Sequence, residues 1–467
     1  MNAADRAVTA LRRALGPSVV DDTPETCEAL SRDESDVAPT VAACVVAPTV
    51  AAQVVEALRL CEAHDVPVYP RGGGTGRTGG SVPLRRGVVL DTRALAGIHE
   101  IDRAGLLAVV GPGTLTASFQ REVEGEGLFF PPDPLSAPWC TLGGNVAENA
   151  GGPRAFKYGV TRDWTLGMDA VLMGGERLAV GRRTAKGVTG YDLTATLVGS
   201  EGTLAVFTSL TLRLMVKPRH LRALAATFTD VVHAGEVVSA LVARGLRARC
   251  VELIDGVCCE VMRTVEPGSV EADAGGMLIV EADGDSEGEV DRCIGEVATV
   301  CEAVPGARFR VAASSEAMAE LWGARRVLSR ALRGRARHKL SEDVVVPRGE
   351  VATLLRAVRG ISERRGVLMP TYGHAGDGNL HVNLLWNDPG ERPAVALAVE
   401  DLFRATLDLR GTLTGEHGIG VTKRDYLSWE QSDALIALQR RVKRAFDARG
   451  LLNPEKILPP SHGHRHC

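Results

Sequence analysis

The sequence predicts an α+β protein with two or three domains. The chain has 467 residues, which is long enough to form several hydrophobic cores. Residues 44–70 contain a strand, a run of helical period and a second strand. From about Arg219 to Ala312 the pattern is β-α-β-β, which is typical of a ferredoxin-like antiparallel sheet covered by helices. Together these patterns indicate a mixed α+β architecture.

Composition excludes several classes of protein. The net charge of -4 and the pI near 6.3 give no basic footprint for nucleic acid. Ten cysteines occur without a CxxC pattern, so neither an iron–sulfur cluster nor a zinc ribbon is expected. The N-terminus lacks the apolar core of a signal peptide, and the apolar residues 37–52 are interrupted by Pro39 and Pro48. We expect a cytoplasmic protein with reduced thiols and no transmembrane segment.

A glycine-rich loop follows the second predicted strand, in the sequence PRGGGTGRTGGSVP from Pro70 to Pro83. Gly74, Gly76 and Gly79 match the spacing GxGxxG, which in an NAD-binding Rossmann fold opens a helix. Here the chain continues into an apolar run at Val88 to Leu90, which predicts a strand. The sequence therefore predicts a glycine loop between two strands. Its amides could cradle a pyrophosphate, and a merely flexible loop is the alternative.

Two further segments combine glycines with small polar residues, at residues 129–164 and 184–208. Their bare backbone would allow a large planar ligand to lie close to the chain, and nearby side-chain amides could meet its polar edge. Ordinary glycine-rich connections are the alternative for both segments.

Histidines are concentrated in two short segments, YGHAGDGNLHVN at Tyr372 to Asn383 and GEHG at Gly415 to Gly418. His374, His381 and Glu416 offer two imidazoles and a carboxylate, a set that suits a borderline metal ion. The glycines between the histidines favour a tight loop running into a strand over residues 380–385. Core or surface histidines beside an ordinary turn are the alternative reading.

A basic helix is predicted from Glu316 to Arg335. Most of its five arginines are expected to face solvent, and one that points inward could hold an anion.

The glycine and histidine segments together resemble one family, the FAD-dependent D-2-hydroxyacid dehydrogenases of the vanillyl-alcohol-oxidase fold. That family includes D-lactate dehydrogenases, D-2-hydroxyglutarate dehydrogenases and the FAD subunit of glycolate oxidase. The resemblance runs from about Val45 to Leu458. It is carried by PRGGGTGRTGG, PPDP, CTLGGNVAENAGGPRAFKYGVTRD, KGVTGYDL, LVGSEGTL, SEDVVVPR, YGHAGDGNLHVN, GEHGIG and NPEKIL.

The resemblance implies an FAD-binding domain at residues 1–217 and a substrate or cap domain with a metal site at residues 218–418. Helices of residues 419–460 would return to the FAD domain, and residues 461–467 would form a disordered tail. Noncovalent FAD is expected, because the first loop contains no His or Cys. The implied FAD-binding residues are Arg71, Gly72, Gly73, Gly74, Thr75, Gly76, Gly79, Gly80, Ser81, Pro132, Asp133, Thr141, Gly144, Asn145, Asn149, Gly152, Glu201, Gly202 and Thr203.

On the substrate side, the resemblance implies that His374, His381 and Glu416 bind a divalent metal, Zn or Mn. His417 would be the catalytic base, and Asn383 would contact the substrate. Arg325 would pair with the substrate carboxylate, with Lys339 as a second contact. Ser329 stands where some relatives have Thr, which leaves the size of the accepted side chain open.

The expected reaction is oxidation of a small 2-hydroxy acid of the D-lactate, glycolate or D-2-hydroxyglutarate type to the 2-oxo acid. Electrons would leave through a separate acceptor: a quinone, a cytochrome, an electron-transfer flavoprotein or an iron–sulfur subunit. The alternative is an FAD-carrying subunit that works only within a glycolate oxidase-like complex. An alkyl-dihydroxyacetonephosphate synthase is disfavoured by GHAGDGNLH. A homodimer and a peripheral association with a membrane stay open.

Overall fold

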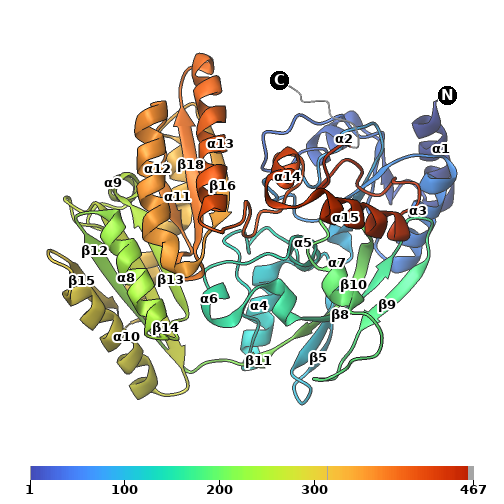
Figure 1. The fold of residues 1–467 in the computed structure, drawn as a ribbon. Helices are drawn as coiled ribbons and strands as arrows, with labels where there is room; N and C mark the ends of the chain where they lie inside the picture. The colour runs from blue at the N-terminus through green and yellow to red at the C-terminus, as the bar shows by residue number, and fades with distance from the viewer. Residues whose placement is uncertain (1, 313, 461–467) are drawn as a thin grey trace. The chain divides into compact units, whose positions relative to one another are not determined.

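The computed structural model describes residues 2–312 and 314–460, and it divides into two compact units (Figure 1). The first unit consists of the chain up to Ala150, Val160–Lys217, and the chain from Glu416 onward. The second unit consists of Gly151–Gly159 and Pro218–Gly415. The tail predicted at residues 461–467 lies outside the described residues.

A four-stranded sheet in the order β1-β2-β4-β3 begins the first unit, and β2 and β3 both run parallel to β4. Its elements are α1 (Ala3–Leu15), β1 (Val20–Asp21), α2 (Pro24–Leu30), β2 (Cys44–Val46), α3 (Ala51–Ala63), β3 (Val68–Arg71), β4 (Val88–Asp91) and η1 (Thr92–Ala94). Leu58 of α3 and Val88 of β4 are fully buried in one core with Leu11 of α1. The predicted β-α-β unit is confirmed. No helix occurs between β3 and β4, so the glycine loop does join two strands.

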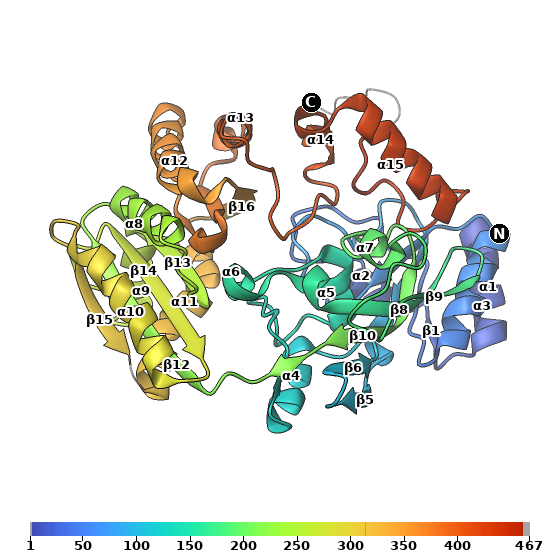
Figure 2. The same cartoon turned by 60° about the horizontal axis from the view of Figure 1, so that its bottom comes forward.

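The rest of the first unit contains a five-stranded antiparallel sheet in the order β5-β6-β10-β8-β9 and the short pair β7 and β11 (Figure 2). Its elements are β5 (Ile98–Asp102), β6 (Leu107–Val110), α4 (Thr116–Gly125), β7 (Leu128–Phe129), α5 (Leu142–Glu148), η2 (Thr161–Trp164), β8 (Thr165–Val171), β9 (Arg177–Gly181), α7 (Leu193–Leu197), β10 (Val206–Arg213) and β11 (Met215–Val216).

The C-terminal chain packs within the first unit as η6 (Arg424–Tyr426), α14 (Leu427–Glu430) and α15 (Asp433–Phe446). The sequence placed the start of this segment at residue 419, whereas the structure places it at Glu416. Hydrogen bonds explain the earlier start, because Thr78 Oγ1 donates to the carbonyl of His417 at 3.1 Å. The backbone N–H groups of Ile419 and Gly420 donate to Glu201 at 2.8 and 2.7 Å.

The second unit is built on a seven-stranded antiparallel sheet in the order β15-β12-β14-β13-β17-β18-β16. Contacts place α8 and α10 on β12 and β14, and they place α9 and α11 together (Figures 1 and 2). The elements are β12 (His220–Phe228), α8 (Val231–Ala243), β13 (Cys250–Asp255), α9 (Gly256–Val265), β14 (Gly276–Gly284), α10 (Glu287–Glu302), β15 (Arg308–Ala312), α11 (Ser315–Arg333), β16 (His338–Val345), η3 (Arg348–Glu350), α12 (Val351–Arg365), β17 (Thr371–Gly373), η4 (Ala375–Asp377), β18 (Asn379–Trp386), η5 (Pro389–Glu391) and α13 (Arg392–Asp408).

The predicted β-α-β-β order was wrong at one point, because α9 lies between β13 and β14. The helix starts at an N-cap, in which the carboxylate of Asp255 accepts the N–H of Cys258 at 2.8 Å. Its residues include two cysteines and three valines, which have modest helix propensity, so the cap and tertiary packing decide the conformation. Cys258 and Cys259 are fully buried in the core that α9 and α11 share.

Residues 151–159 join the second unit although they lie within the predicted FAD domain of residues 1–217. They contain α6 (Ala155–Tyr158). Lys157 Nζ donates to Asp283 Oδ1 at 2.6 Å, and the Tyr158 hydroxyl donates to Asp283 Oδ2 at 2.9 Å. Burial and the Asp283 carboxylate raise the pKa of Tyr158, so its hydroxyl stays a donor. These bonds explain why residues 151–159 pack within the second unit, although the residues on either side of them in sequence belong to the first.

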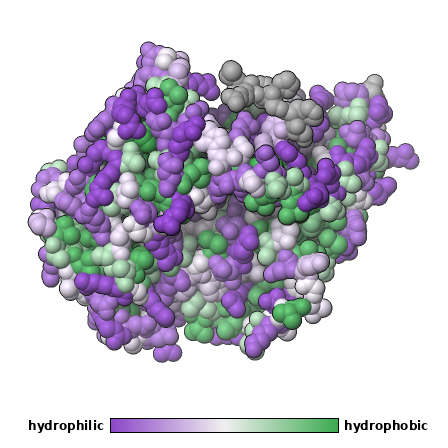
Figure 3. Space-filling model, viewed as in Figure 1, coloured by the Kyte–Doolittle hydropathy of each residue, from purple (hydrophilic) through white to green (hydrophobic). Residues whose placement is uncertain are grey.

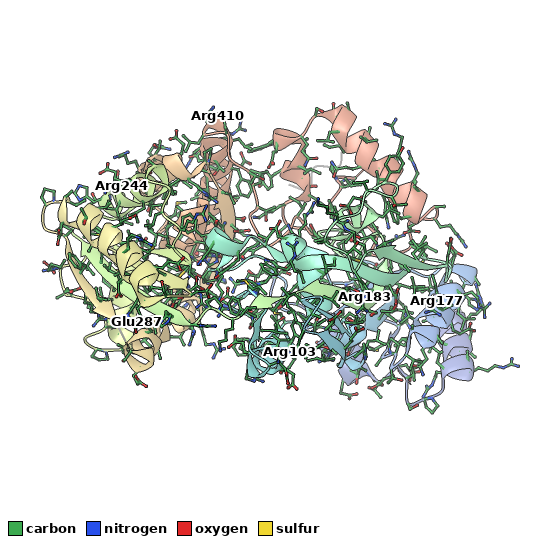
Figure 4. All side chains as sticks on the ribbon, turned by 90° about the horizontal axis from the view of Figure 1, so that it is seen from below. Arg103, Arg177, Arg183, Arg244, Glu287 and Arg410 are labelled. Atoms are coloured by element: carbon green, nitrogen blue, oxygen red, sulfur yellow. The ribbon has the colours of Figure 1, made fainter. Side chains whose placement is uncertain are left out.

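Most charged residues lie on the outside of each unit. Hydrophilic residues predominate over α12 and α13 in Figure 3. Figure 4 labels six exposed charged residues: Arg103, Arg177, Arg183, Arg244, Glu287 and Arg410. Within the described chain, no helix is both long and apolar enough to cross a membrane. The nine cysteines in that part of the chain are free thiols, and all but Cys293 are buried.

Asp447 pairs with Lys443 in the returning C-terminal chain, and Lys443 connects this chain to the rest of the first unit. The buried carboxylate of Asp447 accepts from Lys443 Nζ at 2.6 Å and from the N–H of Leu452 at 2.8 Å. Lys443 Nζ also donates to the carbonyl of Thr203 at 2.6 Å. We expect Asp447→Ala to lower the free energy of unfolding by about 3 kcal/mol, because it leaves the partly buried ammonium of Lys443 without its counter-charge. Urea denaturation measures this loss.

The exposed residue Arg441, on the same helix, supplies the control. Arg441→Ala should change the free energy of unfolding by less than about 0.5 kcal/mol. Equal midpoints for the two variants would contradict the role of Asp447.

Candidate active site

The glycine loop lies against the start of α5 in the first unit. A Cβ added at Gly72 would overlap Thr141 Oγ1, and one added at Gly73 would overlap the backbone carbonyl of Trp139. Thr141 caps α5 by accepting the N–H of Gly144 at 3.2 Å. The first and second predicted FAD segments therefore meet at a place where only glycine fits.

Arg71 sits beneath this loop. Its guanidinium is buried, and a Cβ at Gly74 would overlap it. Neither Nε nor Nη1 of Arg71 has a hydrogen-bond acceptor among the residues that the structure describes. Buried guanidinium donors without acceptors are costly in a protein interior. An anionic group such as a pyrophosphate would satisfy them, so this loop fits the phosphates of a dinucleotide.

The third predicted segment and the C-terminal chain hold the same loop from another side. Asn453 Nδ2 donates to the carbonyls of Gly80 and Glu201, at 2.9 and 2.7 Å. Lys456 Nζ donates to the carbonyls of Gly79 and Val82, at 2.7 and 2.5 Å. Burial lowers the pKa of Lys456 to about 8. Sequence reasoning did not single out Asn453 or Lys456, although both lie in the block NPEKIL.

Several side chains that were predicted to bind FAD have partners within the protein. Asn145 Nδ2 donates to Thr116 Oγ1 at 2.7 Å, and Asn149 Oδ1 accepts from the N–H of Arg162 at 2.9 Å. Thr203 Oγ1 donates to the carbonyl of Ser200 at 2.8 Å. These side chains shape their loops. Direct FAD contacts by all of the predicted residues remain predictions, including those by Thr75, Gly76, Ser81, Pro132, Asp133 and Gly202. Gly152 falls in the second unit.

The first histidine segment forms a tight loop that runs into β18, as predicted. Gly378 has a φ of +80°, and a Cβ there would overlap the carbonyl of Val346, so the turn requires glycine. The loop brings the rings of His374 and His381 to a centroid distance of 5.2 Å. Both side chains are buried. The structure therefore places two of the three predicted metal ligands together within the second unit.

Each of these histidines lies beside a buried carboxylate that sequence reasoning missed. Glu252 of β13 contacts His374 Nδ1 through Oε1. Oδ1 of Asp343, on β16, lies 3.5 Å from Nδ1 of His381. Both carboxylates are 0% exposed. Carboxylates in this position commonly orient histidine ligands of metals.

Arg325 is the one inward-pointing arginine of the basic helix, with 1% exposure, whereas Arg326, Arg330, Arg333 and Arg335 are exposed, as expected. Its Nη2 lies 2.6 Å from Glu252 Oε2, and its guanidinium carbon lies 4.6 Å from the centroid of the Tyr372 ring. Burial alone would raise the pKa of Glu252. His374 and Arg325 outweigh that effect and lower it to about 2, so the carboxylate is ionised.

Lys339 and Asn383 lie on the same face of the sheet as His381, because alternate residues of a strand share a face and Asp343 pairs with His381. Ser329 lies one helical turn after Arg325 on α11, and its Oγ accepts from Lys339 Nζ at 2.9 Å. Asn383 is fully buried and donates to the carbonyl of Pro370 at 3.1 Å. Its Oδ1 has no donor among the described residues, which leaves an acceptor for a ligand.

Glu416 and His417 stand where the chain passes from the second unit to the first. Gly415, the last residue of the second unit, donates its N–H to Asp343 Oδ2 at 2.8 Å. Glu416 follows by one peptide bond. His417 is attached to the first unit by the bond from Thr78. The metal-ligand role of Glu416 and the catalytic role of His417 remain predictions.

Comparison with known proteins identifies the family. The model described as FAD linked oxidases, C-terminal domain, matches residues 217–457, and the FAD binding domain matches residues 42–181. The chain is 35% identical to the glycolate oxidase subunit GlcD of Bacillus subtilis over 444 residues, which cover 95% of this chain and 94% of that protein. The chain belongs to the FAD-linked oxidase family.

Other FAD-linked oxidases are similarly related. A D-lactate dehydrogenase of Archaeoglobus fulgidus is 33% identical over 417 residues, covering 89% of this chain and 91% of that protein. Among solved structures, p-cresol methylhydroxylase with bound substrate matches with a TM-score of 0.81 at 17% identity, covering 97% of this chain and 96% of that one. The likeness in structure shows the vanillyl-alcohol-oxidase-type fold. As an FAD-linked oxidase, the protein binds FAD and is an oxidoreductase.

The packing of Gly73 gives a test of the FAD loop. We expect Gly73→Ala to reduce the FAD bound per polypeptide, because the added Cβ would collide with backbone at Trp139 and Cys140, which cannot move aside like a side chain. The ratio of flavin to protein absorbance measures the amount of FAD bound per polypeptide.

Gly125, at the end of α4, meets nothing within 4 Å of an added Cβ. Gly125→Ala should therefore retain full flavin and serves as the control. Full flavin in both variants would contradict the described packing.

Proposed function

We propose that the protein oxidises a small D-2-hydroxy acid to the 2-oxo acid, using noncovalent FAD and a divalent cation, Zn²⁺ or Mn²⁺. The observation that carries this proposal is the pair of buried imidazoles of His374 and His381, each beside a buried carboxylate. Two buried imidazoles suit a borderline metal. Arg325 and Lys339 provide positive charge on the same unit for a substrate carboxylate.

The proposed roles follow from the chemistry of each side chain. When bound, the flavin supplies a two-electron acceptor and the cation a Lewis acid. His374, His381 and Glu416 would hold the cation. Arg325 and Lys339 would bind the substrate carboxylate, and a guanidinium fork matches that anion well.

The remaining roles concern the substrate hydroxyl. The conversion removes the hydroxyl proton and the α-hydrogen of the substrate. Neutral His417 would accept the hydroxyl proton at an imidazole nitrogen, since histidine is a base near pH 7. Asn383 Oδ1 is an acceptor that would orient the hydroxyl group.

The substrate class is also supported by the names of the relatives, which include a glycolate oxidase subunit and D-lactate dehydrogenases. The acceptor of the electrons would be a separate molecule. A second candidate function is that of an FAD-carrying subunit within a glycolate oxidase-like complex, which the name "subunit" of the relative GlcD favours. Reduction of an artificial dye by the purified chain alone would exclude that candidate.

Anaerobic titration tests the reaction. We expect D-lactate, glycolate or D-2-hydroxyglutarate to bleach the flavin bands of the purified protein, and we expect prior treatment with a chelator to abolish the bleaching. The spectrum is the measurement, and restoring Zn²⁺ or Mn²⁺ is its control. A flavin that none of the three acids bleaches would refute the proposed substrate class. Bleaching that survives the chelator would refute the metal.

The base is tested separately. His417→Ala should slow flavin reduction by roughly 100-fold or more, the usual scale for removal of a general base. Bound FAD should be unaffected. Stopped-flow absorbance measures the rate, and His99→Ala, at an exposed position of the same unit, is the control. Near-normal reduction in the His417 variant would remove that residue from the mechanism.

A further inference from the structure

We infer that Glu252 is a positioning residue. Its single carboxylate fixes the orientation of two side chains, the metal ligand His374 and the anion-binding Arg325. This inference rests on the proposed function and extends it to a residue outside the ligand set. Its consequence is that metal binding and recognition of the substrate carboxylate depend on the same buried group.

The geometry carries the inference. Glu252 lies in β13, and its two oxygens face different partners. Oε1 contacts His374 Nδ1, while Oε2 accepts from Arg325 Nε at 2.9 Å and lies 2.6 Å from Arg325 Nη2. The partners come from separate parts of the fold, since His374 follows β17 and Arg325 lies on α11. One carboxylate therefore joins a strand, a loop and a helix.

On the histidine side, the contact selects a tautomer. A histidine that donates from Nδ1 presents Nε2 as the ligand atom, and an ionised carboxylate at Nδ1 increases the basicity of the ring. Glu252 is 0% exposed, so bulk solvent does not reach this position. Without the Glu252 carboxylate, His374 would lose the acceptor at Nδ1 that fixes its orientation.

On the arginine side, the same carboxylate fixes the guanidinium. Arg325 contacts both the carboxylate of Glu252 and the ring of Tyr372. A guanidinium has five donors in a rigid fork, so pairing of one edge with Glu252 leaves donors to offer a second anion. The ion pair also supports burial of both charges, since a buried arginine without a counter-charge is costly.

Glu281 provides a matched control. It is a buried glutamate on the neighbouring strand β14, and its Oε1 accepts from Trp322 Nε1 at 2.5 Å. Trp322 lies on α11, three residues before Arg325. Glu281 thus joins the same sheet to the same helix, but its contacts are with Trp322 and Arg249. If Glu252 only stabilised the fold, substitution of Glu252 and substitution of Glu281 would have the same effect on binding.

The experiment compares Glu252→Gln with Glu281→Gln and the wild type, all loaded with FAD. A glutamine amide cannot accept from both partners of Glu252, because one of its two terminal atoms is a donor. After chelation, each protein is titrated with Mn²⁺. Each protein is then titrated with oxalate, a carboxylate anion, at saturating Mn²⁺. The shift of the flavin spectrum reports oxalate binding.

We expect Glu252→Gln to weaken Mn²⁺ binding by roughly 10- to 100-fold, the range for loss of such a partner. We also expect weaker oxalate binding at saturating Mn²⁺. Glu281→Gln should leave both affinities at the wild-type value. Wild-type affinities in Glu252→Gln would overturn the inference. Loss of Mn²⁺ affinity alone would overturn the joint role.

Two further outcomes are distinguishable. A wild-type protein that binds neither Mn²⁺ nor Zn²⁺ would overturn the proposed function itself. If Glu252→Gln does not fold, Glu252→Asp takes its place. It keeps the charge but is one methylene shorter, so it cannot reach both partners, and wild-type values for it would overturn the inference.

Discussion

The buried carboxylate of Asp343 fixes the second unit at the point where the chain leaves it. Asn379 Nδ2 donates to Asp343 Oδ1 at 2.6 Å, and the N–H of Gly415 donates to Oδ2 at 2.8 Å. His381 lies beside the same group. A buried charge is tolerated only when such donors surround it. The start of β18, the strand β16 and the departing chain are therefore held as one network.

Much of the fold and part of the site could be predicted from the sequence. The β-α-β unit, the glycine loop between strands and the loop that holds the two histidines are encoded by local spacing, which periodicity and turn chemistry reveal. The helix α9 was missed because its propensity is weak, and the cap at Asp255 was not recognised.

Glu252 could not be assigned from local sequence, since its partner His374 is 122 residues away and Arg325 is 73 residues away. One signal was available. The strand CVELID alternates, and Glu252 falls on the side of Cys250 and Ile254, which both belong to the core. A carboxylate among apolar positions of a buried strand indicates a partner elsewhere in the chain. The partners of Asn145 and Asn149 were likewise not evident from local sequence, because Asn145 Nδ2 donates to Thr116 of α4 and Asn149 Oδ1 accepts from the N–H of Arg162.

The interleaving of the two units determines the order in which the FAD loop can be completed during synthesis. The carbonyls of Gly79, Gly80 and Val82 depend on Asn453 and Lys456. Those two residues leave the ribosome only after all of Pro218–Gly415 has been made. The FAD loop can therefore reach its final hydrogen-bonded arrangement only after residues 453–456 have been added to the chain.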